Sequence, residues 1–309
     1  MRIDRRDLKW RARDAMRAAC PNARFMTFLY LLLTTGLGGV ASWFVADPVG
    51  NVLHLYGQGV ALDRALPLAL IAVGRMGIFL NILMAVFGVV INFGYKIWCL
   101  NTARSEPGEL GDLFSGFSMV GRILWLRVLI LVYGFLWYVA IFMPMGLLIV
   151  LVAGMSVVLP MLGVPLLVGA FLLAFALWFS RIARYAMAVY CLSDESEMGA
   201  SWALRRSRRM MEGHVKDYFL LQLSFVGWYL LSMLIVTVVE HTIIAVVGGP
   251  QLLMSWDIEA IAQISSSTAV AAVLALAAWP LKLWLMPYIT MTECNFYDKI
   301  KGGAESTSI

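Results

Sequence analysis

The sequence predicts an all-α protein: a polytopic membrane helix bundle of about six transmembrane helices plus short cytoplasmic amphipathic helices. Its composition is the first reason. The 309-residue chain is 61% hydrophobic and 14% charged, with a mean hydropathy of +0.81. Soluble domains carry about 45–50% apolar and about 25% charged residues, so this apolar excess indicates lipid as part of the solvent. The length of the apolar segments and the distribution of basic residues are the other two reasons.

A transmembrane helix needs about 20 apolar residues, because the hydrocarbon layer is about 30 Å thick and a helix rises about 1.5 Å per residue. We expect one integral membrane domain over 1–309, which opens with a basic cytoplasmic helix at 1–24 and closes with a cytoplasmic tail at 291–309. The six spans are predicted at about 25–46, 76–100, 123–150, 165–192, 218–239 and 268–290.

The first span is longer than the apolar stretch of a signal peptide, which covers about 7–15 residues, and is therefore predicted to be an uncleaved anchor. A connection rich in Gly and Pro is expected over 47–75. The stretch 123–192 is almost continuously apolar and too long for one span. Gly154, Pro160, Gly163 and Pro165 interrupt it, which predicts a tight turn between two antiparallel spans.

Basic residues indicate the orientation, because cytoplasmic loops retain an excess of Lys and Arg. With six spans, nearly all basic residues fall on one side, and only Arg64 and Arg75 fall on the other. The predicted outer loop from Glu240 to Ser267 has no Lys or Arg. We therefore predict a multi-pass protein of the cell's inner membrane with both termini in the cytoplasm. The net charge of +5 follows the spans rather than a separate domain, so no nucleic-acid partner is expected.

The reactive residue types form no recognisable site. Cys20, Cys99, Cys191 and Cys294 all fall at predicted cytoplasmic span ends, where thiols stay reduced, and no CxxC is present. His54, His214 and His241 lack the spacing of paired metal ligands. No nucleophile elbow and no carboxylate pair within a span is found. We expect no catalytic residue, no metal and no cofactor.

Short amphipathic segments precede the odd-numbered spans on the predicted inside. Their apolar residues recur at i, i+3, i+4 and i+7, which is the period of a helix with one apolar face. Leu8, Ala12, Ala15, Met16 and Ala19 form the first such face; Leu110, Leu113, Phe114 and Phe117 the second; Ala200, Ala203, Leu204, Ser207, Met210 and Met211 the third. On the third segment, the opposite face carries Arg205, Arg206, Arg208 and Arg209.

Two interpretations of these segments stay open. Basic amphipathic helices can lie in the headgroup plane of an anionic leaflet, where each Lys or Arg contributes about 1 kcal/mol. Alternatively, they are connectors that happen to touch lipid. Together with the hairpin pattern, they suggest three units, each an interfacial helix followed by two spans.

Polar side chains within spans are the second group of candidate residues, because lipid makes them costly. They are Asn81, Asn92, Gln222, Ser224 and Lys282. On a functional interpretation they line a polar cavity that opens to the cytoplasm. On a structural one, the amides form hydrogen bonds between helices and the Lys282 side chain reaches the headgroups.

The most distinctive segment is SWALRRSRRMMEGHVKDYFLLQLSFVGW, from Ser201 to Trp228, which is followed later by PYITMTECNFYDKI, from Pro287 to Ile300. With these segments the chain resembles the domain of unknown function 975 family, which comprises bacterial multi-pass membrane proteins. The shared pattern is Ala203-Leu204 with Ser207, Met211 with Gly213-His214, Leu223 to Trp228, Pro287-Tyr288 and Phe296-Tyr297. The resemblance implies a bacterial cytoplasmic membrane protein and supplies no activity.

Gly213 is expected to end the third amphipathic helix in a left-handed conformation, with the His214 side chain bonded to the free carbonyls of the last turn. The leading functional expectation is a non-enzymatic membrane protein. Its basic inner-surface residues, with Arg205, Arg206, Arg208, Arg209 and His214 as candidates, would contact anionic lipid or a membrane protein partner. The alternative is a permease or exporter of small molecules or lipids, with Asn92, Gln222 and Lys282 lining its path.

Overall fold

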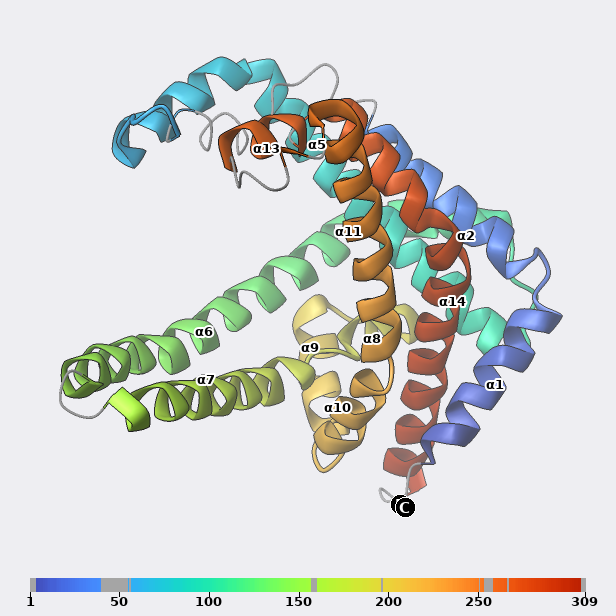
Figure 1. The fold of residues 1–309 in the computed structure, drawn as a ribbon. Helices are drawn as coiled ribbons and strands as arrows, with labels where there is room; N and C mark the ends of the chain where they lie inside the picture. Colours follow the sequence, from blue (N-terminus) through green and yellow to red (C-terminus); the bar gives the residue numbers. More distant parts are fainter. Residues whose placement is uncertain are drawn as a thin grey trace. The chain divides into compact units, whose positions relative to one another are not determined.

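The computed structural model describes residues 4–39, 55, 57–156, 160–195, 197–249, 251–252, 258–265 and 267–306, and the regular elements in these ranges are helices (Figure 1). In chain order they are α1 (Arg5–Ala18), α2 (Ala23–Leu31), the π-helix η1 (Leu32–Gly36), α5 (Leu62–Ala103), the 3₁₀ helix η2 (Leu110–Met119), α6 (Val120–Ser156), α7 (Pro160–Ala183), α8 (Ala188–Asp194), α9 (Ala200–Met210), α10 (Val215–Leu223), α11 (Val226–Gly248), α13 (Ile258–Ser265) and α14 (Thr268–Ser306).

The all-α membrane fold class is confirmed. Five segments are long and apolar enough to cross a membrane, judged by length and composition within the described residues: Gly77–Ala103, Leu110–Leu148, Val168–Asp194, Val215–Gly248 and Ala269–Gly303. They correspond to the second to sixth predicted spans. The first predicted span is helical from Ala23 to residue 39, and its remainder, 40–46, lies outside the described residues.

Contacts divide the chain into two compact units. Unit 1 comprises Met1–Leu8, Ser118–Ser224 and Glu293–Ile309; unit 2 comprises Lys9–Phe117 and Phe225–Thr292.

Unit 1 contains the predicted hairpin. Helices α6 and α7 run side by side as a long antiparallel pair (Figure 1). Aromatic rings line their contact: the ring centroids of Phe142 and Phe171 are 6.3 Å apart, and those of Phe142 and Trp178 6.5 Å. The Arg181 guanidinium lies 4.5 Å from the ring centroid of Trp137 and so adds a cation–π contact between the two helices.

Within unit 2, a small polar cluster joins α2 to α5. The hydroxyls of Thr27 and Tyr95 are hydrogen bonded at 2.9 Å, and the rings of Tyr30 and Tyr95 stack at 4.6 Å. The Asn92 amide donates to the Tyr30 hydroxyl at 3.0 Å. Between helices in lipid, where apolar packing alone gives little driving force, such polar pairs help to hold the bundle together.

Several helices differ from the predicted spans. Helix α5 begins at Leu62, inside the connection expected over 47–75, and accommodates Pro67. The fourth span is interrupted after Ala183 before α8 begins, and the fifth is interrupted between α10 and α11. The interruptions fall near the predicted inner side, where the short helices α8 and α9 pack on each other and α10 packs on α7 in unit 1.

The tail expected over 291–309 is also different, because α14 continues without a break to Ser306. Its final turns are packed rather than free. Met291, Cys294, Tyr297 and Ile300 recur at a spacing of three residues and are buried, as is Phe296. The helical apolar period thus extends well past the predicted span and into the stretch expected as the cytoplasmic tail.

The second amphipathic segment does not form one apolar face either. Over Leu110–Met119 the chain is a 3₁₀ helix, which has three residues per turn, so Phe114 and Phe117 align with each other and not with Leu113. Leu113 is fully buried, whereas Leu110, Phe114 and Phe117 are each almost half exposed.

Gly94 is the point of closest approach between α5 and η2. A Cβ atom there would overlap the backbone carbonyl oxygen of Leu113 and lie 2.6 Å from that of Asp112. Gly88, less than two turns earlier on α5, has no atom within 4 Å of an added Cβ. We expect Gly94→Ala to lower the free energy of unfolding by about 1–3 kcal/mol, because backbone atoms cannot move aside cheaply.

Thermal unfolding of the purified protein in detergent tests this prediction, with Gly88→Ala as the matched control. The control should be neutral or slightly stabilising, because alanine favours a helix over glycine by up to about 1 kcal/mol. Equal unfolding temperatures for the two variants would contradict the close approach of η2 to α5.

Candidate functional site

Helix α9 presents four arginines on a support fixed by protein contacts. Its residues Ala200, Ala203, Leu204, Ser207 and Met210 are buried, and the helix packs on α8 and α6. Ser207 donates to the backbone carbonyl of Arg184 at 2.8 Å. The small side chains of Ala203 and Ser207 permit this close packing. The apolar face of α9 is therefore occupied by protein.

The arginine side chains of α9 point the other way. Arg205, Arg208 and Arg209 are exposed, and Arg206 is half-buried. Within the described residues, none of the four forms an ion pair with a carboxylate. Two of them, Arg208 and Arg209, stand in the last turn of α9, where cations are favoured by the helix dipole.

The turn after α9 follows the prediction at Gly213 and departs from it at His214. Gly213 has φ +81°, the left-handed region that favours glycine. The His214 side chain does not bond the carbonyls of α9; its Nδ1 atom lies 3.7 Å from the carboxylate of Asp217, one turn ahead in the chain.

Gln222 belongs to a hydrogen-bond network centred on Glu293. The Gln222 amide donates to Glu293 Oε1 at 2.6 Å and to the Tyr218 hydroxyl at 3.0 Å. Tyr190 donates to Glu293 Oε2 at 3.2 Å. The network thus joins α8, α10 and α14 within unit 1. Gln222 is among the residues that the sequence indicates and Glu293 is not, because Glu293 falls in the stretch expected as a cytoplasmic tail, 291–309.

A second carboxylate is held nearby in unit 1. Asp194, at the end of α8, accepts a hydrogen bond from the Tyr297 hydroxyl at 2.8 Å and one from the Lys301 ammonium at 2.7 Å. The Asp194 side chain is only 10% exposed, and these two hydrogen bonds help to stabilise its charge. These two hydrogen bonds attach the final turns of α14 to the end of α8.

The other predicted intramembrane polar residues are dispersed. Asn81 donates to the carbonyl of Gly77 on its own helix, and Ser224 donates to that of Leu221. Asn92 bonds Tyr30 between helices, as the structural interpretation expects. Lys282 is half-buried and forms no hydrogen bond or ion pair with the parts of the chain that are described.

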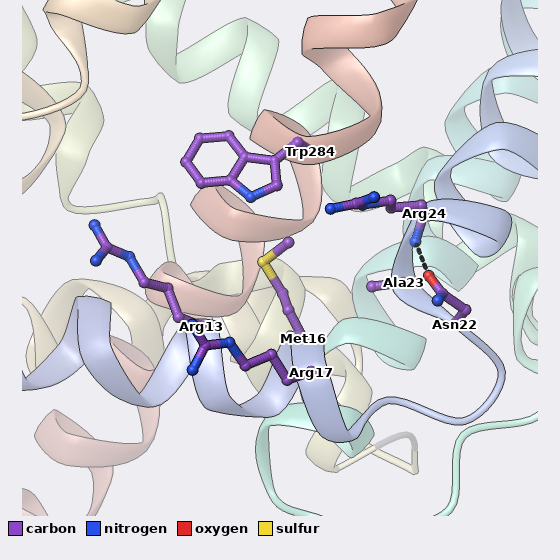
Figure 2. A pocket seen from close by; sticks show the side chains of 7 residues that line it. All are labelled: Arg13, Met16, Arg17, Asn22, Ala23, Arg24 and Trp284. Atoms are coloured by element: carbon purple, nitrogen blue, oxygen red, sulfur yellow. Dashed lines mark hydrogen bonds between the residues drawn. The ribbon is translucent and has the colours of Figure 1, made fainter.

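Unit 2 contains a basic cavity that sequence analysis did not predict. Its volume is about 610 Å³, and it lies among α1, the start of α2 and α14 (Figure 2). The lining residues are Arg13, Met16, Arg17, Asn22, Ala23, Arg24 and Trp284. Three of these seven are arginines and none is acidic. The spacing of Arg13 and Arg17, which places both on one face of a helix, is the signal that could have indicated it.

Comparison with known proteins identifies the family. The family model described as protein of unknown function (DUF975) matches residues 1–304. The chain belongs to this family. No curated protein and no solved structure matches it.

In this DUF975 protein, the pattern that suggested the family lies largely at packing positions. Ala203, Leu204 and Ser207 form the buried face of α9, and Phe296 and Tyr297 are buried on α14. Burial of these residues gives them a role in packing the helices. The arginines of the cavity lie in the basic leader before the first span, which the family model also covers.

The Glu293 network should matter for stability, because a carboxylate that loses its best donor keeps its desolvation cost. We expect Gln222→Leu to lower the free energy of unfolding by about 1–3 kcal/mol. The matched control is Asn81→Leu, which removes an amide that bonds only one carbonyl of its own helix and is exposed. Denaturation in detergent measures both, and an unaffected Gln222→Leu variant would show that the network contributes nothing to folding.

Proposed function

We propose that this protein is a non-enzymatic component of the bacterial cytoplasmic membrane whose basic inner-surface helices hold anionic lipid or a membrane protein partner. One observation carries the proposal: the arginines of α9 project from a helix whose other face is buried in protein. Because this support is fixed, the four charges face outward without any rearrangement of the helix. Near an anionic leaflet each contributes about 1 kcal/mol.

Removing the charges tests this role. The variant with Arg205, Arg206, Arg208 and Arg209 all changed to Gln should lose most of the thermal stabilisation that phosphatidylglycerol gives relative to phosphatidylcholine in mixed micelles. The cause is the lost attraction to anionic headgroups, which salt should also weaken in the wild type. The lysine variant at the same four positions is the control and should retain most of the effect, since it keeps the charge.

An unchanged lipid preference in the glutamine variant would reject a lipid role for α9. If that variant keeps its lipid preference but loses a protein that is purified with the wild type, the arginines hold a partner instead.

The proposed orientation follows from the distribution of basic residues, with both termini in the cytoplasm. The cysteines offer a direct test, because Cys20 is exposed while Cys99, Cys191 and Cys294 are buried. A membrane-impermeant maleimide should leave the protein unlabelled in intact spheroplasts and add one label per chain in inside-out vesicles. Cys20→Ser should abolish the label, and labelling in spheroplasts would reverse the proposed topology.

A permease or exporter is the second candidate. The Gln222–Glu293 pair favours it, because these two polar residues lie in two segments long enough to cross a membrane. Against it, Asn92 is bonded to a neighbouring helix, and none of Asn92, Gln222 and Lys282 lines the basic cavity. Loss of a transport phenotype in Lys282→Leu or Asn92→Leu would favour this second candidate over the first.

A further inference from the structure

The basic cavity of unit 2 is built from three separate parts of the chain. Arg13, Met16 and Arg17 come from consecutive turns of α1, Asn22 to Arg24 from the start of α2, and Trp284 from the middle of α14. Figure 2 shows the Arg24 side chain extending from α2 toward the side on which Trp284 and Met16 lie. The volume of about 610 Å³ is typical of a site for a small molecule, for which about 300–1,000 Å³ is usual.

The three guanidinium groups use few of their N–H donors in hydrogen bonds to described residues. Arg13 uses one nitrogen on the Tyr288 hydroxyl at 3.2 Å, and its guanidinium carbon lies 5.3 Å from the centroid of that ring. Among the residues that the structure describes, Arg17 has one distant counter-ion, Asp14, at 3.9 Å, and both side chains are more than half exposed. The Arg24 guanidinium has no hydrogen bond or ion pair within the described ranges.

Three like charges line one cavity, and Asp14 offsets only that of Arg17, so an anion bound among them would reduce their mutual repulsion. Each guanidinium carries five N–H donors in a planar fork that matches the oxygens of a phosphate group. The start of α2 adds to this field, because the first turn of a helix bears partial positive charge and Asn22 already caps it at 2.9 Å. The electrostatics of the cavity therefore select an anion with several oxygen acceptors.

The cavity wall also contains two apolar side chains, Trp284 and Met16, which lie between Arg13 and Arg24 in Figure 2. The Trp284 ring contacts Trp228 and Tyr288, with centroids 5.1 Å and 5.0 Å apart, so it is held on two sides. Met16 adds a flexible apolar surface. A free inorganic anion would leave this part of the wall unused, whereas an ester with an apolar group next to its phosphate would contact both parts.

We propose that this cavity binds one phosphate-bearing amphiphile, with Arg13, Arg17 and Arg24 around the phosphate and Trp284 and Met16 against the adjoining apolar part. The chemistry is that of a phosphate ester, which a phospholipid headgroup or a soluble phosphate ester could supply. The assignment rests on the proposed function, since it gives anionic lipid a defined position on the predicted inner side, but it uses none of the arginines of α9.

Native mass spectrometry of the full-length protein in detergent tests the site. The probes are phosphatidylglycerol, diacylglycerol, glycerol 1-phosphate and inorganic phosphate. The test variant is Arg17→Gln with Arg24→Gln, which leaves the Arg13–Tyr288 contact intact. The control is Arg6→Gln with Arg11→Gln, which removes two exposed charges from the same helix outside the cavity.

The wild type and the control should each retain one tightly bound phosphatidylglycerol, and the test variant should bind it at least about tenfold more weakly, the equivalent of about 1.4 kcal/mol. Diacylglycerol should not compete, because it lacks the phosphate. If glycerol 1-phosphate displaces the lipid, the ligand is a soluble ester; if it does not, the ligand is a phospholipid. Equal affinity of the test variant and the wild type, or retention of diacylglycerol as tight as that of phosphatidylglycerol, would overturn the proposal.

Native mass spectrometry and the thermal-stabilisation comparison, each applied to both variants, separate this site from the proposed function. The glutamine variant of α9 should keep the single tight lipid while losing its general preference for anionic lipid. If the α9 variant keeps that preference but the cavity variant loses the tight lipid, the proposed role of α9 fails and the cavity assignment stands. If the cavity variant keeps its lipid, the cavity assignment fails by itself.

Discussion

A peptide group inside hydrocarbon has no water with which to form a hydrogen bond, and this constraint determines most of the structure. Each backbone N–H and C=O must be satisfied within the segment, so the apolar stretches are helical. Apolar packing gives little advantage over contact with lipid, and the helices must therefore be joined by other means. The Thr27–Tyr95 and Gln222–Glu293 hydrogen bonds and the stacked aromatic rings supply such contacts.

The same constraint explains which parts of the fold could be predicted from sequence. Spans such as α6 and α7 follow from length and hydropathy, and their turn from clustered Gly and Pro. The helix α14 continues beyond the predicted span because its apolar period persists where the hydropathy falls. The last turns of α14 carry Glu293, Asn295, Asp298 and Lys299, which lower the hydropathy. The helix persists there because Met291, Cys294 and Tyr297 still repeat along one face.

The candidate sites were predictable to different degrees. The arginines of α9 form one local pattern, so their shared face can be derived from spacing alone. The basic cavity combines residues that are more than 250 positions apart in the chain, and nothing in the sequence indicates that Trp284 approaches Arg13 and Arg24. Those arginines were interpreted as orientation signals, since a charge beside a span satisfies that role wherever its side chain points. Which of these distant side chains line the same cavity depends on the tertiary structure and cannot be derived from local sequence spacing.

The pairing of α14 with α8 has a consequence for biosynthesis. Asp194 on α8 precedes its partner Tyr297 by 103 residues, and Tyr190 precedes Glu293 by the same number. At about 5–20 residues per second, translation of that interval takes roughly 5–20 s. During this time Asp194 and the buried face of α8 have none of their α14 contacts. Unit 1 can therefore acquire its final packing only after two further spans have been synthesised.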